Sequence, residues 1–282
     1  MSALGILWFF LIFLLIAGYF VLDGFDLGVG CLYPFIARTE GEKELLRASI
    51  APVWDGNEVW LLTAGGALFA AFPAAYACTF SGFYLAIMLV LFALIIRVVS
   101  LVLHHGNDLH KVWDWGFFIG SALPALLLGV AIGNVFAGVP LTANGDYAGI
   151  PLLGLIKPFT LLCGLLGLAM FLAAGASWIA LKSPVDSDLR ARAITLRRYF
   201  QIAALALFAL ATLWVFAFVK PHMVAGLGIV RVLLALLTVA ALVGALLLGM
   251  KAPVGKAAAD AYRLTTCPVS MMPIMMKIMA EK

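Results

Sequence analysis

The sequence predicts an all-α, polytopic membrane protein. Of its 282 residues, 65% are apolar and only 11% are charged, with a mean hydropathy of +1.12. Soluble domains carry charge on about a quarter of their residues. Apolar runs of about 20 residues, the length that crosses the hydrocarbon core, recur along the chain with short loops between them. These observations exclude a sizeable water-soluble domain.

Seven apolar stretches are the expected transmembrane helices, at residues 5–30, 57–77, 82–102, 115–137, 152–181, 199–219 and 228–250. The first is expected to stay as a span and not to be a cleaved signal peptide, because no Lys or Arg precedes it and no small-residue cleavage pattern follows it. The second is short and contains Gly65, Gly66 and Pro73. Membrane helices tolerate such residues where neighbours satisfy the backbone.

The distribution of Lys and Arg predicts the orientation. With seven spans, most of these residues fall on one side, in and around the loops 31–56, 97–114 and 182–198. If the stretch 57–77 did not cross, the early and late basic loops would lie on opposite sides. The positive-inside rule therefore predicts that these loops are cytoplasmic and that the N-terminus lies on the outer face. The net charge of +4 is interpreted as loop charge, and nucleic-acid binding is not expected.

Four acidic residues lie in or beside apolar spans. Asp23 and Asp26 belong to LDGFDLGVG at the inner end of the first span, and Asp55 and Glu58 belong to APVWDGNEVW. The members of each pair are three residues apart and share a helix face. Two interpretations are open: helix capping (by Asp55) with interhelical hydrogen bonding, or a path for protons or cations. Arg97, which ends the third span, is expected to snorkel to the interface, with pairing to a carboxylate as the alternative.

The His and Cys residues indicate no cofactor held by this chain. The four Cys residues are far apart, without a CxxC or CxxCH motif. Haem in a helix bundle needs axial ligands that face each other within the membrane. Three His residues lie in the loop sequence LHHGNDLHKVWDWG, and His222 is also outside the span centres. We expect a solvated polar loop there, with a metal site formed by His104, His105, Asp108 and His110 as the alternative.

Four Trp residues, Trp54, Trp60, Trp113 and Trp115, lie at one predicted level of the membrane interface. An aromatic belt is the favoured interpretation, and a stack facing a quinone or a haem is the alternative.

Four segments carry a resemblance to a known family: LDGFDLGVG, APVWDGNEVWLLTAGGALFAAFPAAYA, SGFYLAIMLVLFALIIR and WDWGFFIGSALPALLLGVAIGN. Read together, they resemble subunit II of the cytochrome bd-type quinol oxidases, including the cyanide-insensitive relatives. The likeness extends over residues 5–257 and is strongest up to Asn134.

The resemblance implies a complex in the bacterial cytoplasmic (inner) membrane that oxidises quinol, reduces dioxygen to water and takes protons from the cytoplasm. In such a complex the haems and the quinol site belong to partner subunit I, while subunit II has no haem ligands of its own. A small single-span subunit and lipid are further implied partners.

The resemblance also implies functional residues. The family's WDG aspartate matches Asp55 and is placed on a proton route from the cytoplasm toward the haems. The other expected members of the route are Glu58, Asp23, Asp26 and Asp114. The expected supporting residues are Trp54, Asn57, Trp60 and Arg97.

The sequence departs from the family pattern near its C-terminus. Family members usually have nine spans in two four-helix bundles plus a peripheral helix, whereas here the pattern breaks after KAPVGKAAADAY. We therefore expect a membrane domain at 1–257, with one four-helix bundle and an incomplete second bundle, and a divergent Met-rich tail at 258–282. The tail is expected to lie on lipid or on a partner, with Cu(I) binding by its thioethers as the alternative.

A second class of function competes with the oxidase hypothesis. The four acids could line a substrate site in a stand-alone, cation-coupled secondary permease. Such a transporter is expected to show a pair of broken spans in corresponding halves, and the sequence shows no such pair.

Overall fold

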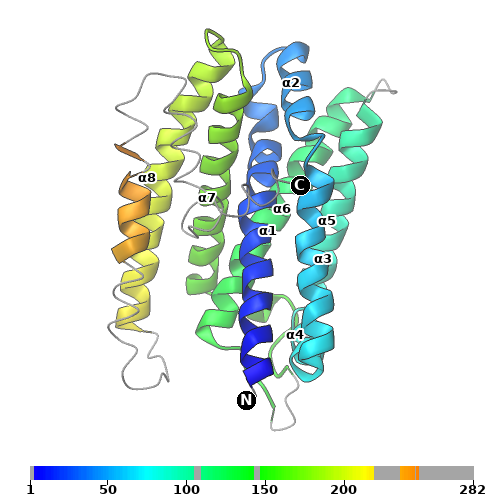
Figure 1. The fold of residues 1–282 in the computed structure, drawn as a ribbon, viewed down its shortest axis with the longest axis vertical. Helices are drawn as coiled ribbons and strands as arrows, with labels where there is room; N and C mark the ends of the chain where they lie inside the picture. The colour runs from blue at the N-terminus through cyan, green and yellow to red at the C-terminus, as the bar shows by residue number, and fades with distance from the viewer. Residues whose placement is uncertain (1–2, 105–108, 143–146, 219–235, 245, 248–282) are drawn as a thin grey trace.

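The computed structural model describes residues 3–104, 109–142, 147–218, 236–244 and 246–247 (Figure 1). Within this part of the chain the fold is all-α and contains no β-strand, as the sequence predicts. The elements are α1 (Ala3–Ile36), α2 (Glu40–Ile50), α3 (Trp54–Ala71), α4 (Pro73–Gly82), α5 (Tyr84–Leu103), α6 (His110–Ala137), η2 (Leu153–Leu155), α7 (Pro158–Lys182) and α8 (Asp188–Ala217).

The long helices run roughly parallel to one another along the long axis of the molecule (Figure 1). α1 packs against α3, α6 and α7, α5 packs against α6, and α7 packs against α8. Thus α1, α3, α5 and α6 form the predicted first bundle, and α7 with α8 begins the second. The chain is a multi-pass membrane protein: within the described residues, five helices, α1, α5, α6, α7 and α8, are long and apolar enough to cross a membrane.

The second predicted span, 57–77, is a pair of helices. α3 ends at Ala71 and α4 begins at Pro73, with Phe72 between them at φ −138° and ψ 66°. Proline lacks an amide donor and disfavours helical geometry in the residue before it, which explains the break. α3 lies against α1, and Figure 1 shows α4 continuing toward the end of the molecule that holds the N-terminus.

The helices extend beyond the apolar stretches that predicted them. α1 continues to Ile36, so Asp26 lies ten residues from its end, or roughly 15 Å at 1.5 Å per residue. The acids of α1 therefore lie in the interior of the helix and not at its end. α8 begins at Asp188 instead of near 199, because the Ser187 side chain accepts a hydrogen bond from the amide of Arg190 and caps the helix.

Small residues allow α1 and α7 to pack closely. A Cβ atom on Gly28 would overlap the backbone oxygen of Phe171, and one on Gly175 would overlap the backbone of Gly28. Close approach of backbones at small residues is the usual means of helix association in membranes. The glycines of LDGFDLGVG thus fix the buried half of α1, which carries the two acids, against the second bundle.

The predicted loop 31–56 contains a helix, α2, that the sequence analysis missed. The Thr39 hydroxyl accepts a hydrogen bond from the amide of Glu42 at 3.2 Å and caps the helix. Leu46 and Ile50 are buried in a hydrophobic cluster that includes Ile36. The Thr-x-x-Glu spacing and the apolar positions four residues apart are signals for such a helix.

The three basic loops meet at one end of the molecule. Arg192, near the start of α8, pairs with Glu42 of α2 at 2.6 Å, and Lys43 of α2 pairs with Asp114 near the start of α6 at 2.6 Å. Figure 1 shows α2 and the turn between α7 and α8 at the end opposite the N-terminus. This grouping agrees with the predicted alternation of spans.

The predicted seventh span, 228–250, lies outside the described residues except for 236–244 and 246–247, which are helical. The Met-rich tail at 258–282 lies wholly outside them, as do His105, Asp108 and His222.

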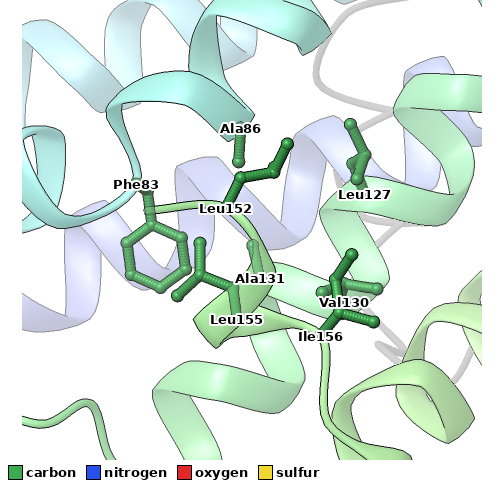
Figure 2. Close-up of a pocket in the computed structure, with 8 residues that line it drawn as sticks. All are labelled: Phe83, Ala86, Leu127, Val130, Ala131, Leu152, Leu155 and Ile156. Carbon is green, nitrogen blue, oxygen red and sulfur yellow. The ribbon is translucent and has the colours of Figure 1, made fainter. Parts of the chain in front are cut away.

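A small apolar pocket lies between α5, α6 and the segment around η2 (Figure 2). Its eight lining residues are Phe83, Ala86, Leu127, Val130, Ala131, Leu152, Leu155 and Ile156. The lining side chains are all apolar, and its place by η2 puts it at the end of the bundle away from α2. It therefore carries no acid or base chemistry.

Candidate functional site

A cluster of buried charged side chains lies between α1, α3 and α5. Asp23 of α1 is fully buried, and Arg97 of α5 is only 2% exposed. The Arg97 guanidinium donates to both carboxylate oxygens of Asp23, from Nη2 to Oδ1 at 2.7 Å and from Nη1 to Oδ2 at 3.1 Å. Such a two-point pair fixes both side chains in position. The prediction that Arg97 snorkels is therefore wrong, and its alternative, pairing with a carboxylate, is correct.

Asp26 is the second fully buried acid of the cluster. Its Oδ2 accepts a hydrogen bond from the Asn57 amide at 2.7 Å, and the same amide donates to the backbone oxygen of Leu22 at 3.1 Å. Asn57 therefore holds the start of α3 against the middle of α1. The other Asp26 oxygen, Oδ1, has no hydrogen-bond partner in the described part of the chain.

Glu58 joins this cluster from α3. Its Oε1 lies 3.3 Å from Nη2 of Arg97, and its side chain is 22% exposed, which makes it the most accessible of the three acids. Two carboxyl groups, those of Asp23 and Glu58, thus share one guanidinium, and the buried carboxyl group of Asp26 lies in the same cluster without an ion pair of its own among the described contacts. This surplus of carboxyl groups over cations gives the cluster the capacity to take up protons.

Asp55 lies at the surface, in the first turn of α3. The N-cap of that helix is Val53, and no side chain caps it, so the prediction that Asp55 is the cap is wrong. A carboxylate in the first turn still interacts favourably with the helix dipole. Because Asp55 precedes Glu58 by three residues, the two lie on neighbouring positions of one helix face. Polar side chains therefore run inward from the surface at Asp55 to the buried cluster.

The remaining residues around the cluster are aromatic. Trp54 is half-buried at the start of α3, and the half-buried Trp60 packs on Gly18 of α1. Sequence analysis missed Tyr19, which is fully buried one turn before Asp23 on the same face of α1. The spacing of four residues between Tyr19 and Asp23 is the signal that could have found it.

Asp114 belongs to a different cluster. Its carboxylate pairs with Nζ of Lys43 at 2.6 Å and lies 3.0 Å from Nε2 of His104. These contacts join Asp114 to α2 and to the end of α5, and its place at the start of α6 sets it at the basic end of the bundle. The structure thus brings together five of the predicted site residues, namely Asp23, Asp26, Asn57, Glu58 and Arg97, and leaves Asp114 apart from them.

The family follows from comparison of the whole chain with known proteins. The sequence model of the family "Cytochrome bd terminal oxidase subunit II" matches residues 4–279. The chain belongs to this family. Relatives include the "Probable cytochrome oxidase subunit 2" of Haemophilus influenzae, 44% identical over 221 residues, and the "Cytochrome bd-I ubiquinol oxidase subunit 2" of Escherichia coli, 42% identical over 224 residues. Each alignment covers 76% of this chain and 58% of the relative, so the chain matches less than two thirds of their length.

A solved structure supports the fold of this cytochrome bd subunit II. It is described as "The structure of bd oxidase from Geobacillus thermodenitrificans", and it superimposes with a TM-score of 0.73 at 17% identity. The superposition covers 96% of this chain and 86% of that chain. The likeness therefore extends over the first bundle and the start of the second.

A cytochrome implies haem, and the described His residues do not fit haem ligation. His104 is 4% exposed and is held between Arg47 and Asp114 at the end of α5, and His110 is exposed at the start of α6. Neither lies in the middle of a span facing a second axial ligand. The expectation of a solvated loop is wrong for His104. Two neighbouring cations, Arg47 and Lys43, also disfavour a metal ion there, and no group of metal-binding side chains is found among the described residues.

Proposed function

We propose that this chain is the haem-free subunit II of a cytochrome bd-type terminal oxidase, a complex that oxidises quinol and reduces dioxygen to water. Membership of the family and the names of the relatives support this proposal over the permease hypothesis. The haems and the quinol site belong to a partner subunit I, and the described His residues, which do not fit haem ligation, support that division. Lipid and a small single-span subunit are further partners in this proposal.

The contribution of this chain to the reaction is a proton route. The observation that carries this proposal is the line of polar groups from the exposed Asp55, through Glu58, to the pair of Arg97 with Asp23 and on to Asp26. Along this line Glu58 and Asp26 are the groups that take up and release protons, while Asp23, whose two oxygens both accept from Arg97, fixes the position of the guanidinium.

The chemistry of the buried cluster suits proton transfer. Asp26 Oδ1 has no hydrogen-bond partner among the described residues, so it offers a lone pair to an incoming proton. The fixed charge of Arg97 offsets the negative charge of Asp23 and holds its carboxylate in place. Asn57 orients Asp26 through its amide. Trp54 and Trp60 are proposed to shield the route.

The protons come from the cytoplasm in this proposal. The basic loops at the α2 end are the cytoplasmic ones by the positive-inside rule, which places the N-terminus on the outer face of the bacterial inner membrane. Asp114, held by Lys43 and His104, lies at that cytoplasmic end. Because its carboxyl group is buried, it is proposed as a member of the route beneath the cytoplasmic surface and not as a group exposed on it.

Substitution of Asp55 tests the proton route. Asp55→Asn keeps the size of the side chain and removes only the titratable carboxyl group. Because α3 is not capped by this residue, the cost to folding is the loss of one charge near the helix dipole, about 0.3 to 1 kcal/mol. Asp188→Asn is the matched control, since Asp188 is also exposed and lies in the first turn of α8 at the same end.

The complex that carries Asp55→Asn should assemble with normal haem content and consume oxygen about tenfold or more slowly with quinol as the reductant. The complex that carries Asp188→Asn should turn over at the wild-type rate. Wild-type turnover by a normally assembled Asp55→Asn complex would end the proton-route proposal.

A further inference from the structure

A second polar cluster connects α2 to the ends of three transmembrane helices. The Arg47 guanidinium of α2 donates to the hydroxyl of Tyr33 on α1 and contacts His104 after α5. Lys43 of α2 pairs with Asp114 of α6, which also contacts His104. We call these five residues the α2 anchor. Four of them are buried and Lys43 is half-buried, so the contacts of the anchor largely exclude solvent.

The geometry at one atom of the α2 anchor is unusual. Nε2 of His104 lies 3.0 Å from Nη1 of Arg47 and 3.0 Å from Oδ1 of Asp114. A guanidinium can only donate, and an ionised carboxylate can only accept. A single ring nitrogen therefore satisfies one of these two partners at a time. The neutral ring that carries its proton on Nδ1 accepts from Arg47 through Nε2, and the fully protonated ring donates from Nε2 to Asp114.

We propose that His104 is a positioning residue whose protonation state controls α2: the neutral ring holds the C-terminal half of α2 in place, and the protonated ring releases it. On protonation Arg47 loses one acceptor and faces a new positive charge at the same distance. The contact of Lys43 with Asp114 does not depend on the state of the ring. The release is therefore confined to the half of α2 that carries Arg47.

Among the described residues, charged and titratable groups lie around His104 on three helices. They are Lys43, Glu44 and Arg47 on α2, Tyr33 on α1, and His110 and Asp114 on α6. Burial, with the positive charge of Arg47 and the neighbouring His110, lowers the pKa of His104 below its ordinary value, against the opposing effect of Asp114. His104 is therefore neutral at neutral pH, with the C-terminal half of α2 held in place, and its protonation occurs at a pH below the ordinary His pKa of about 6.5.

The released half of α2 leads directly into the proposed proton route. The backbone oxygen of Arg47 accepts from the amide of Ala51 at 3.0 Å, and the amide of Val53 donates to Ile50 at 3.0 Å. Asp55 follows two residues after Val53. Arg47 keeps its contacts with Tyr33 and Glu44, and the loss of its contact with His104 weakens the hold on the turn that presents Asp55. The proposed positioning role of His104 rests on the contacts of the α2 anchor and does not depend on the proposed function being correct.

This inference is tested by hydrogen exchange of the backbone amides of residues 40–53. The exchange is measured by mass spectrometry on the purified full assembly at pH 5.5 and 7.5, and the rates are corrected for the effect of pH on chemical exchange. The wild-type segment should lose protection by about two- to tenfold at pH 5.5, the factor that corresponds to the net worth of one hydrogen bond. His104→Gln should remove this dependence, because a Gln amide can accept from Arg47 and donate to Asp114 at once and does not titrate. His110→Gln is the matched control and should keep it.

Equal corrected protection of the wild-type segment at both pH values would overturn the inference, and so would a pH dependence that survives in His104→Gln. If His104→Gln does not assemble, Asp114→Asn replaces it as the test. Loss of that carboxylate removes the group that favours the protonated ring, so the loss of protection should move to lower pH. An unchanged midpoint in Asp114→Asn would likewise overturn the inference.

Discussion

Removal of the buried guanidinium of Arg97 should lower the melting temperature of the protein substantially. Arg97→Met keeps much of the length of the side chain. It removes both hydrogen bonds that Arg97 donates to the carboxylate of the fully buried Asp23. Breaking one partner out of a buried ion pair costs about 3 to 5 kcal/mol, whereas surface pairs contribute about 0 to 1 kcal/mol. At roughly 2 to 4 °C per kcal/mol, the melting temperature should fall by about 6 to 20 °C.

The assay is the fraction of monodisperse protein left in detergent after heating, for wild type and variants. Arg198→Met is the matched control, because Arg198 is an exposed arginine on α8, and it should melt within about 2 °C of wild type. The double variant Asp23→Leu with Arg97→Met should recover most of the loss, because an apolar pair of similar volume is often as stable as the ion pair. A melting temperature of Arg97→Met equal to that of the control would refute the buried pair as a structural element.

Three further predictions concern packing, topology and acid stability. Gly28→Ala should destabilise by about 1 to 3 kcal/mol, because its Cβ would overlap a backbone oxygen of α7, whereas Gly41→Ala in open space should be neutral or stabilise by up to ~1 kcal/mol in thermal unfolding. A single Cys at Val185, in the exposed turn before α8, should not react with a membrane-impermeant thiol reagent in intact cells, and efficient labelling would reverse the proposed orientation. Burial opposes ionisation of Glu42, but hydrogen bonds, including one from Arg192, outweigh burial and lower its pKa. The stability from this contact is therefore fully present above the ordinary Glu pKa of about 4.3 and is lost as the pH falls through the lowered pKa of Glu42. Glu42→Gln should abolish this pH dependence in melting curves measured between pH 3 and 5.

Three helices of the first bundle, α1, α5 and α6, could be predicted from hydropathy, because each is long and apolar enough to cross a membrane. The ends could not, because they depend on capping and on polar contacts made by residues far apart in the sequence. Ser187 begins α8 well before its apolar stretch. α2 has too few apolar residues to stand out as a span, and it is held by Thr39 and by the α2 anchor.

The candidate site could be predicted in part. The spacing of three residues identified both acidic pairs, and the structure places Asp23, Asp26 and Glu58 together in one cluster. The partner of Asp23 could not be predicted, because Arg97 is 74 residues away. The two side chains meet only because α1 and α5 both pack against α6. His104 was assigned to a solvated loop for the same reason, since its burial comes from α2, a helix that hydropathy does not reveal.

The central claim is that this chain works as the haem-free subunit of a cytochrome bd-type oxidase. The most direct measurement is purification of the tagged chain in mild detergent, followed by visible absorbance and mass spectrometry of the isolated particle. A second polypeptide that carries haem should copurify with the chain in fixed ratio, and the particle should consume oxygen when quinol is added. A stable, colourless, solitary chain would contradict the claim.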